Sequence, residues 1–232
     1  MDFKLSVIIP SYNEEKYIEE TLKRLKKQSY GNVEVIVVDS SADDKTRKIS
    51  EKYADKTIHL NERGIAKARN VGAKAAGGDI FVFVDADTLL EDGALKEICS
   101  SFEDPDVAGV CSYIEVDSSF LNRVLFKAVS ESVWILSKLN LPLFYGMCVS
   151  YRRCVFEKIN GFNEELVTTE DLDVSRRAAR FGKCVLNKKV RVLTSARRVE
   201  KGGFFTIVTF HIVNLVNFLL FRKTEENYPA LR

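Results

Sequence analysis

The chain has 232 residues, is 46% hydrophobic and carries 35 Lys and Arg against 33 Asp and Glu, a formal net charge of +2. This composition suits one globular domain with a sizeable core and argues against disorder. The near-neutral charge gives no support to a general nucleic-acid-binding protein. Five cysteines without a Cys-x-x-Cys pair argue against a disulfide framework or a zinc site and suit a reducing, cytoplasmic interior.

Short apolar runs alternate with helical patterns in the first half of the chain. Residues 5–9, 33–38 and 80–84 are almost entirely apolar and rich in β-branched side chains, which is typical of strands buried on both faces. Between them, one-face spacing over 17–25 and the segment 64–78, which ends in two glycines, predict helices. This order predicts an α/β protein that opens with a β-α-β-α-β unit and a parallel sheet.

The alternation weakens after about Asp117. A long helical pattern over 122–138 precedes an irregular stretch, a helix from about Glu170 and an apolar C-terminal segment. The chain contains no repeat, low-complexity tract or Pro/Gly-rich linker, and its first ten residues lack the pattern of a signal peptide or an N-terminal anchor. We therefore expect one domain over 1–202, followed by a C-terminal apolar helix and tail over 203–232.

Polar segments follow three of the expected strands, at 10–14, 39–41 and 85–87. In open α/β sheets, ligands bind beyond the carboxyl ends of the strands. Asp85 and Asp87, separated by one small residue, can face a divalent cation and the phosphates or ribose bound to it, and oxygen ligands suit Mg²⁺ or Mn²⁺. For this short pattern alone, a solvated turn is the alternative, because Asp is common in turns.

The chain resembles the family 2 glycosyltransferases of the GT-A fold in four ordered segments: SVIIPSYNEEKYIEETLKRLKKQS, VEVIVVDSSADDKT, GIAKARNVGAKAAGGDIFVFVDADT and TTEDLDVSRRAARFG. The resemblance covers about Leu5 to Gly182, and four motifs in order are more specific than any one of them. It implies a Rossmann-like, mostly parallel sheet flanked by helices, with a C-terminal apolar helix. It also implies transfer of a sugar from a nucleotide-diphosphate donor to an acceptor hydroxyl.

The same resemblance assigns roles at the donor site. It gives the nucleobase and ribose to Pro10, Tyr12, Glu14 and Asp39, the diphosphate to Lys67 and Arg69, and the ribose and metal to Asp85 and Asp87, with Asp87 the principal ligand. The chemistry agrees, because an aromatic ring packs on a base and a guanidinium fork matches phosphate oxygens. A helix entry is the alternative for the segment at 12–14, and a solvated helix face is the alternative for the two basic residues.

The resemblance makes Asp171 the general base and gives Glu170 the task of orienting the acceptor or the loop. An inverting transferase needs a carboxylate that takes the proton from the acceptor hydroxyl. The alternative is structural, because Thr168 and Asp171 have the spacing of a capping box at a helix start.

Between Arg176 and Lys201 the chain has ten basic residues and one acid, a cluster that favours anions. Diphosphate, anionic lipid headgroups and solvent are alternative partners of this cluster, and Arg197 and Arg198 are the candidates for late diphosphate contacts. The segment lacks the Trp of the Q-x-x-R-W element that processive family members carry, which argues against polysaccharide elongation.

The stretch from Phe204 to Phe221 has eighteen residues without Asp, Glu, Lys or Arg, at the lower limit for a bilayer span. Polar residues interrupt it, so we favour contact with a membrane surface or a second subunit over packing on its own domain. His211 in this stretch reads as a packed histidine. Contact with the inner face of the cell membrane would place the site near a lipid-linked acceptor.

The sequence as a whole predicts a metal-dependent, inverting glycosyltransferase that uses Mg²⁺ or Mn²⁺, a nucleotide-diphosphate sugar and a carbohydrate or lipid-linked acceptor. A nucleotidyltransferase is one alternative, although it would usually open with a Gly-rich phosphate loop, and PSYNEE has no glycine. A nucleotide-sugar-binding protein without catalysis is the other.

Overall fold

The computed structural model describes residues 2–195, 197, 209, 213–214 and 217–218. The described elements alternate between strand and helix through the first half of the chain, as the sequence predicts. In chain order they are β1 (Leu5–Ser11), α1 (Ile18–Lys26), β2 (Val33–Asp39), α2 (Lys45–Ser50), β3 (Lys56–His59), α3 (Ile65–Ala75), β4 (Ile80–Val84), β5 (Thr88–Leu90), α4 (Ala94–Ser101), β6 (Val107–Val116), α5 (Phe120–Lys138), β7 (Cys148–Arg152), α6 (Arg153–Lys158), α7 (Glu170–Ala178) and β8 (Lys183–Thr194).

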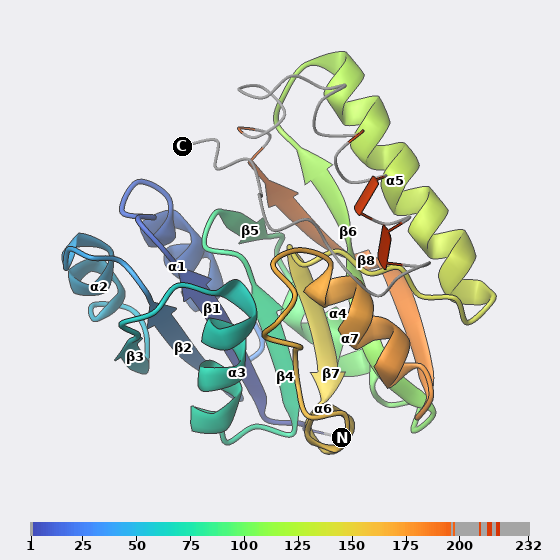
Figure 1. Ribbon diagram of the computed structural model, residues 1–232, viewed down its shortest axis with the longest axis horizontal. Coiled ribbons are helices and arrows are strands. Elements are labelled where there is room, and N and C mark those ends of the chain that lie inside the picture. Colours follow the sequence, from blue (N-terminus) through green and yellow to red (C-terminus); the bar gives the residue numbers. More distant parts are fainter. Residues whose placement is uncertain (1, 196, 198–208, 210–212, 215–216, 219–232) are drawn as a thin grey trace.

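The strands form one mixed sheet of eight in the order β3-β2-β1-β4-β7-β6-β8-β5 (Figure 1). Strand β1 pairs in parallel with β2 and β4, and β2 pairs in parallel with β3, which confirms the parallel opening unit. Every residue of β1 and β4 is buried, as expected of predominantly apolar strands between two layers of helices. Strand β7 then runs antiparallel to β4 and β6, so the second half of the sheet is mixed.

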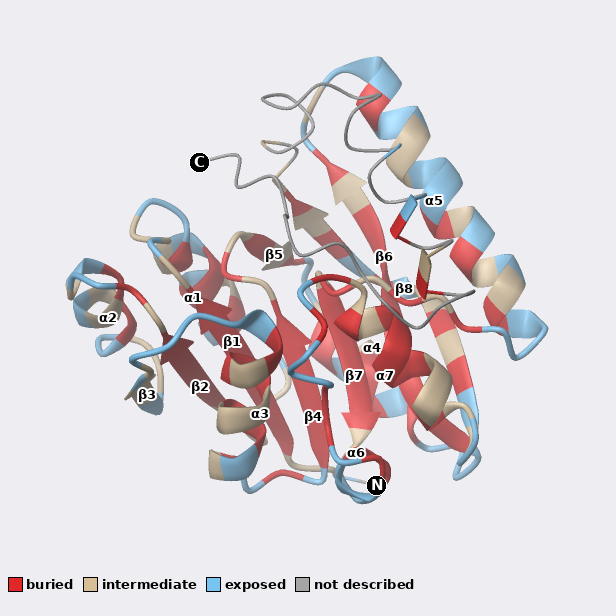
Figure 2. Cartoon of the chain, viewed as in Figure 1, coloured by how far each residue is buried: buried red, intermediate tan, exposed pale blue. Residues whose placement is uncertain are grey.

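Helices cover both faces of the sheet, and the buried residues concentrate between the layers (Figure 2). Alternate residues of β1 point to opposite faces. Val7 packs in the cluster that contains residues of α1 and α4, whereas Ile8 packs in the cluster with residues of α3, α6, α7 and α5. The expected helices over 17–25, 64–78 and 122–138 and from Glu170 are therefore confirmed as α1, α3, α5 and α7.

This topology gathers several chain segments at one edge of the sheet. The carboxyl ends of β1, β2 and β4 meet there because the three strands are parallel. The antiparallel strand β7 begins at the same edge, where Cys148 lies opposite Val84. Thr88 lies opposite Thr194 at the end of β8, so the segment that follows β8 also reaches this edge.

The expected boundary between 202 and 203 and most of the apolar stretch from 204 to 221 lie outside the described residues. One described residue of that stretch, Phe218, is 1% exposed and packs with Leu166 and Leu172 of the main domain. This residue thus shows packing on the chain's own domain, the arrangement that we favoured less from the sequence. Across the part of the chain that the structure describes, no helix is both long enough and apolar enough to cross a membrane.

Candidate active site

The loop after β1 is fastened to the loop after β2. Asn13 adopts a left-handed conformation with φ of 54°, which Asn tolerates better than most residues. Its backbone N–H donates to Ser41 Oγ at 2.7 Å, and the N–H of Glu14 donates to Thr46 Oγ1 at 3.1 Å. Two of the polar segments expected to meet therefore lie together at the sheet edge.

Asp39 lies at the end of β2 beneath this loop and is fully buried. Its Oδ1 accepts hydrogen bonds from Ser11 Oγ at 3.0 Å and Ser41 Oγ at 2.7 Å. Its Oδ2 is buried and has no hydrogen-bond partner among the described residues. A buried carboxylate oxygen without a donor is costly, so this atom suits an N–H group supplied by a ligand.

Tyr12 lies in the loop after β1 and is half-buried. The guanidinium of Arg63 lies 4.1 Å from the centroid of its ring. The sequence gives no sign of this contact, because an exposed arginine in a loop such as Arg63 carries no signal by itself. Lys67, which the sequence assigned to the diphosphate, instead forms an ion pair with Glu62 on the surface. Pro10 is buried in β1, opposite Val38.

Asp85 and Asp87 follow β4, and their side chains have different partners. The backbone between them is held by α1, where Thr21 Oγ1 donates to the carbonyl of Ala86 at 2.8 Å. The Asp85 carboxylate accepts from Arg69, whereas the Asp87 carboxylate faces Arg197 at 3.1 Å. The two carboxylates thus have different partners, an arginine of α3 for Asp85 and an arginine from beyond β8 for Asp87.

Arg69 on α3 is the centre of a buried ion-pair network. Its side chain is 1% exposed, and its two terminal nitrogens donate to Glu170 Oε1 and Asp85 Oδ1, each at 2.9 Å. It also donates to the carbonyl of Gly146 at 3.1 Å. Burial alone would lower the pKa of Arg69, but the neighbouring carboxylates raise it. In this arrangement the guanidinium holds carboxylates together, rather than lying open to a phosphate as expected from the sequence.

Asp171 follows Glu170 at the start of α7 and lies beside this network. Desolvation raises the pKa of Asp171 to about 7, and the charge of Glu170 adds to the rise, although Arg69 opposes it. Gly146 makes the close packing possible, because a Cβ there would lie 2.6 Å from Arg69 Nη2 and 3.2 Å from Asp171 Oδ2. The site therefore contains a carboxylate whose protonation changes near neutral pH.

The capping box that the sequence offered as an alternative for Asp171 does not form. Thr169, not Thr168, is the N-cap residue, and it makes no side-chain hydrogen bond to the helix. Both threonine hydroxyls are buried and have no hydrogen-bond partner among the described residues. Thr169 has a left-handed φ of 63°, which is strained for a β-branched residue and removes it from ordinary cap geometry. Asp171 Oδ1 accepts from the adjacent N–H of Leu172, at 2.8 Å.

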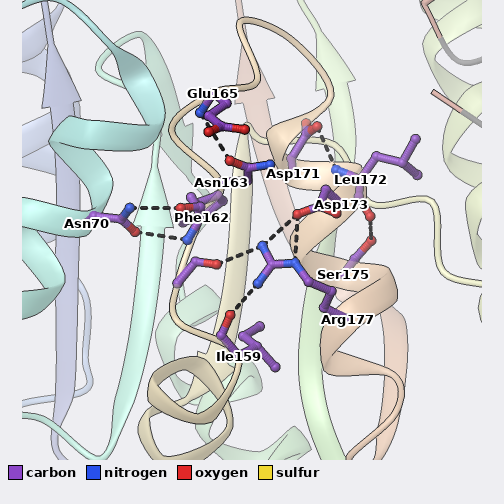
Figure 3. A network of polar contacts seen from close by, with 11 residues as sticks. Asn70, Ile159, Phe162, Asn163, Glu165, Asp171, Leu172, Asp173, Ser175 and Arg177 are labelled. Atoms are coloured by element: carbon purple, nitrogen blue, oxygen red, sulfur yellow. Dashed lines mark hydrogen bonds and ion pairs between the residues drawn. The ribbon is translucent and has the colours of Figure 1, made fainter. Parts of the chain in front are cut away.

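A polar network anchors the loop that leads to α7 (Figure 3). Arg177 pairs with Asp173 on the same helix and donates to the carbonyls of Ile159 and Gly161. Asn70, next to Arg69 on α3, exchanges two hydrogen bonds of 2.9 Å with the backbone of Phe162. These contacts fix the beginning of the loop to α7 and α3, and the ion pair between Glu170 and Arg69 holds the start of α7 against α3.

Arg197 joins the site from the segment after β8. Its guanidinium donates to both oxygens of Glu14, at 3.0 and 2.6 Å, and lies 4.6 Å from the ring centroid of Tyr17. The same group is 3.1 Å from Asp87 Oδ2. The sequence named Arg197 without indicating these partners, and Arg198 lies outside the described residues.

The residues present fit a divalent cation at Asp87. Its carboxylate is an oxygen ligand, its side chain is only 14% exposed, and it already faces a cationic group. Among the described residues, no group of three or more His, Cys, Asp or Glu could hold a metal by itself. A cation with few protein ligands suits Mg²⁺, which usually keeps waters and substrate phosphates in its coordination sphere.

Comparison with known proteins finds relatives that are named as glycosyltransferases. The TarS protein of Staphylococcus aureus (strain MW2), a poly(ribitol-phosphate) beta-N-acetylglucosaminyltransferase, is 39% identical over 181 residues, which cover 72% of this chain and 31% of that protein. EpsJ of Bacillus subtilis, an uncharacterized glycosyltransferase, is 30% identical over 184 residues, 72% of this chain and 53% of that protein.

Solved structures of glycosyltransferases share the fold. The structure of S. aureus TarS residues 1–349 with UDP-GlcNAc matches with a TM-score of 0.70 and 26% identity, over 84% of this chain and 59% of that one. The mannosyltransferase of Pyrobaculum calidifontis with GDP-Man and Mn²⁺ matches with a TM-score of 0.68 and 25% identity, over 82% of this chain and 56% of that one. These matches confirm the expected GT-A fold.

The chain spans about a third to three fifths of the lengths of these proteins. The sequence model described as Glycosyl transferase family 2 matches residues 6–159, which is more than half of the chain. The motifs that define the site, from the loop after β1 to the carboxylates after β4, lie inside this match. On this evidence the chain belongs to glycosyl transferase family 2.

Proposed function

We propose that this chain transfers a sugar from a nucleotide-diphosphate donor to an acceptor hydroxyl, with inversion, and that Asp171 is the general base. The observation that carries the proposal is the placement of Asp171, with a pKa raised to about 7, beside the Arg69 network. That network includes Asp85, which belongs to the donor side of the site. The buried guanidinium of Arg69 therefore contacts both Asp85 on the donor side and Glu170, the neighbour of the proposed base.

The donor nucleotide would bind between the loops that follow β1 and β2. The unpartnered Oδ2 of Asp39 suits the imide N–H of a base, and the ring of Tyr12 suits stacking. Arg63 lies 4.1 Å from the centroid of that ring, so a base would stack on the opposite face of the ring or take the place of the guanidinium. Pro10 and Glu14 complete the proposed nucleotide contacts. The complexes of the related proteins with UDP-GlcNAc and GDP-Man support a nucleotide-sugar donor.

In the proposed reaction the acceptor oxygen forms a bond to the anomeric carbon while the bond from that carbon to the diphosphate breaks on the opposite face. Asp171 takes the acceptor proton, which its ionised form can do near neutral pH. Glu170 and Arg69 act as positioning residues, because their ion pair fixes the start of α7. This assignment changes the expected role of Arg69 from a phosphate contact to the support of the carboxylates.

Asp87, together with Asp85, would hold Mg²⁺ or Mn²⁺. When bound, such a cation supplies positive charge to the departing diphosphate. The Mn²⁺ in the related mannosyltransferase structure supports this part of the proposal. Arg197 and Lys67 remain proposed diphosphate contacts, with Lys67 the weaker of the two because it pairs with Glu62 on the surface.

We further propose a carbohydrate acceptor, in keeping with the poly(ribitol-phosphate) substrate in the name of TarS. A cytoplasmic location, a lipid-linked acceptor and contact of the C-terminal segment with a membrane surface or a second subunit stay predictions. Membership of the family argues against a nucleotidyltransferase. The remaining alternative is a nucleotide-sugar-binding protein without catalysis. It differs from the proposed transferase in that it would bind the donor but show no turnover.

The test is calorimetric titration of UDP-, GDP- and dTDP-sugars with Mn²⁺, followed by turnover with the donor that binds. Asp171→Asn should keep donor affinity within about twofold and lose at least about a hundredfold in rate, the low end for a general base. Asp39→Asn should weaken donor binding instead, because it replaces one acceptor oxygen. The exposed Asp92→Asn is the matched control and should change neither quantity. Full turnover by Asp171→Asn would place the base elsewhere.

A further inference from the structure

The guanidinium of Arg197 occupies an unusual position between two functional carboxylates. It holds Glu14 with both terminal nitrogens and faces Asp87 at 3.1 Å. Arg197 is distant in sequence from the residue it holds, since 183 positions separate it from Glu14. Glu14 follows β1 and Asp87 follows β4, so a single side chain from beyond β8 bridges the proposed nucleotide and metal ligands.

The charge of this group explains the position. The side chains of Glu14 and Asp87 are only 16% and 14% exposed, so water screens their negative charges poorly. The guanidinium supplies the positive charge that these carboxylates need. The guanidinium is itself only 23% exposed. It lies over the ring of Tyr17, and this cation–π contact further stabilises its position.

We infer that Arg197 competes with the divalent cation for Asp87, so that cation binding releases the guanidinium from this carboxylate. The inference rests on the proposed function, because it takes Asp87 as the metal ligand. A guanidinium and a divalent cation against one carboxylate repel each other at close range. Asp87 therefore exchanges one cationic partner for the other, and the guanidinium becomes available to the donor diphosphate.

The exchange makes the contacts of Arg197 sensitive to the occupancy of the site. Thr88 and Thr194, whose hydroxyls are 3.2 Å apart, hold the end of β8 against β5. Arg197 lies three residues beyond this point and contacts Glu14, Asp87 and Tyr17. When Asp87 takes the cation, the Arg197 side chain loses its contact with this carboxylate and is held less tightly.

The experiment measures binding of Mn²⁺ alone to the full chain, without nucleotide, from the electron paramagnetic resonance signal of free Mn²⁺. Arg197→Ala should bind Mn²⁺ about tenfold more tightly than the unmutated protein, a factor that corresponds to the loss of one competing, poorly screened ion pair at Asp87. Arg191→Ala is the matched control, because Arg191 forms an exposed ion pair with Glu115 on β6. It should leave Mn²⁺ affinity unchanged.

Equal or weaker Mn²⁺ binding by Arg197→Ala would overturn the inference, and so would the absence of binding by both proteins. If Arg197→Ala does not fold, limited trypsin digestion of the unmutated chain serves instead. Mn²⁺ should accelerate cleavage after Arg197 but not after Arg191 in β8, and an unchanged rate after Arg197 would overturn the inference. Failure of the proposed function would appear separately, as normal turnover by Asp171→Asn or as no turnover by the unmutated enzyme.

Discussion

Arg69→Met tests how much the buried ion-pair network at the sheet edge contributes to the free energy of unfolding. The substitution keeps an unbranched side chain of similar length and removes the charge. It deletes two charge-assisted hydrogen bonds of 2.9 Å and the bond to the Gly146 carbonyl. Glu170, whose side chain is 9% exposed, then loses its cationic partner inside the protein.

Breaking a buried ion pair by removing one partner costs about 3–5 kcal/mol in the free energy of unfolding. We expect the lower end, about 3 kcal/mol at pH 7, because the side chain of Asp85 is 24% exposed and can regain water. Burial already raises the pKa of Glu170, and loss of Arg69 raises it further. A carboxyl whose pKa is higher in the folded protein than in the unfolded chain favours folding more as the pH falls. The deficit of Arg69→Met should therefore shrink between pH 7 and pH 5.

The assay is urea unfolding followed by circular dichroism at both pH values. Arg191→Met is the matched control, because its exposed ion pair should be worth less than about 1 kcal/mol. Adding Glu170→Gln to Arg69→Met should recover part of the loss, since it removes the unpaired charge. A loss at pH 7 no larger than that of the control, or a loss that grows as the pH falls, would refute the reasoning.

Two further predictions concern the base and its surroundings. The rate of transfer at low donor concentration should rise with pH and level off above an inflection near pH 7, because the pKa of Asp171 is raised to about 7 and only its ionised form accepts a proton; an inflection near pH 4 would show that an ordinary carboxyl controls the rate. Gly146→Ala should lose about 1–3 kcal/mol in unfolding free energy and at least about tenfold in rate, because its Cβ would lie 2.6 Å from Arg69 Nη2. Gly31→Ala, where no atom lies within 4 Å of the added Cβ, is the control, and equal effects of the two substitutions would contradict this prediction.

The sequence identified the strands that are buried on both faces and missed those whose stability depends on pairing. Strand β4 is a continuous apolar run and β1 and β2 are predominantly apolar, and such runs predict central strands without knowledge of their partners. Strand β3 is a partly exposed edge strand of four residues, too short and too polar to stand out. The mixed half of the sheet depends on contacts between distant segments, such as β6 with β8, which periodicity does not encode.

At the site, the sequence identified residue types and their sheet edge but not their partners. Asp85 and Asp87 are two positions apart, yet one pairs with an arginine of α3 and the other faces an arginine from beyond β8. Which carboxylate meets which guanidinium depends on the direction of each side chain after the strand ends. Arg63 was missed for the same reason, because only the folded loop brings it to the ring of Tyr12.

The two arginines show how one sheet edge can hold several carboxylates and still bind a ligand. Without compensation, neighbouring carboxylates repel one another, and burial increases the cost. Arg69 compensates Asp85 and Glu170 from a position that is 1% exposed, where no ligand can replace it without unfolding the surroundings. Arg197, at 23% exposure, compensates Glu14 and Asp87 from a position that solutes can reach. Burial therefore separates the two arginines: Arg69 fixes Asp85 and Glu170 in place, and Arg197 is accessible to a ligand beside Glu14 and Asp87.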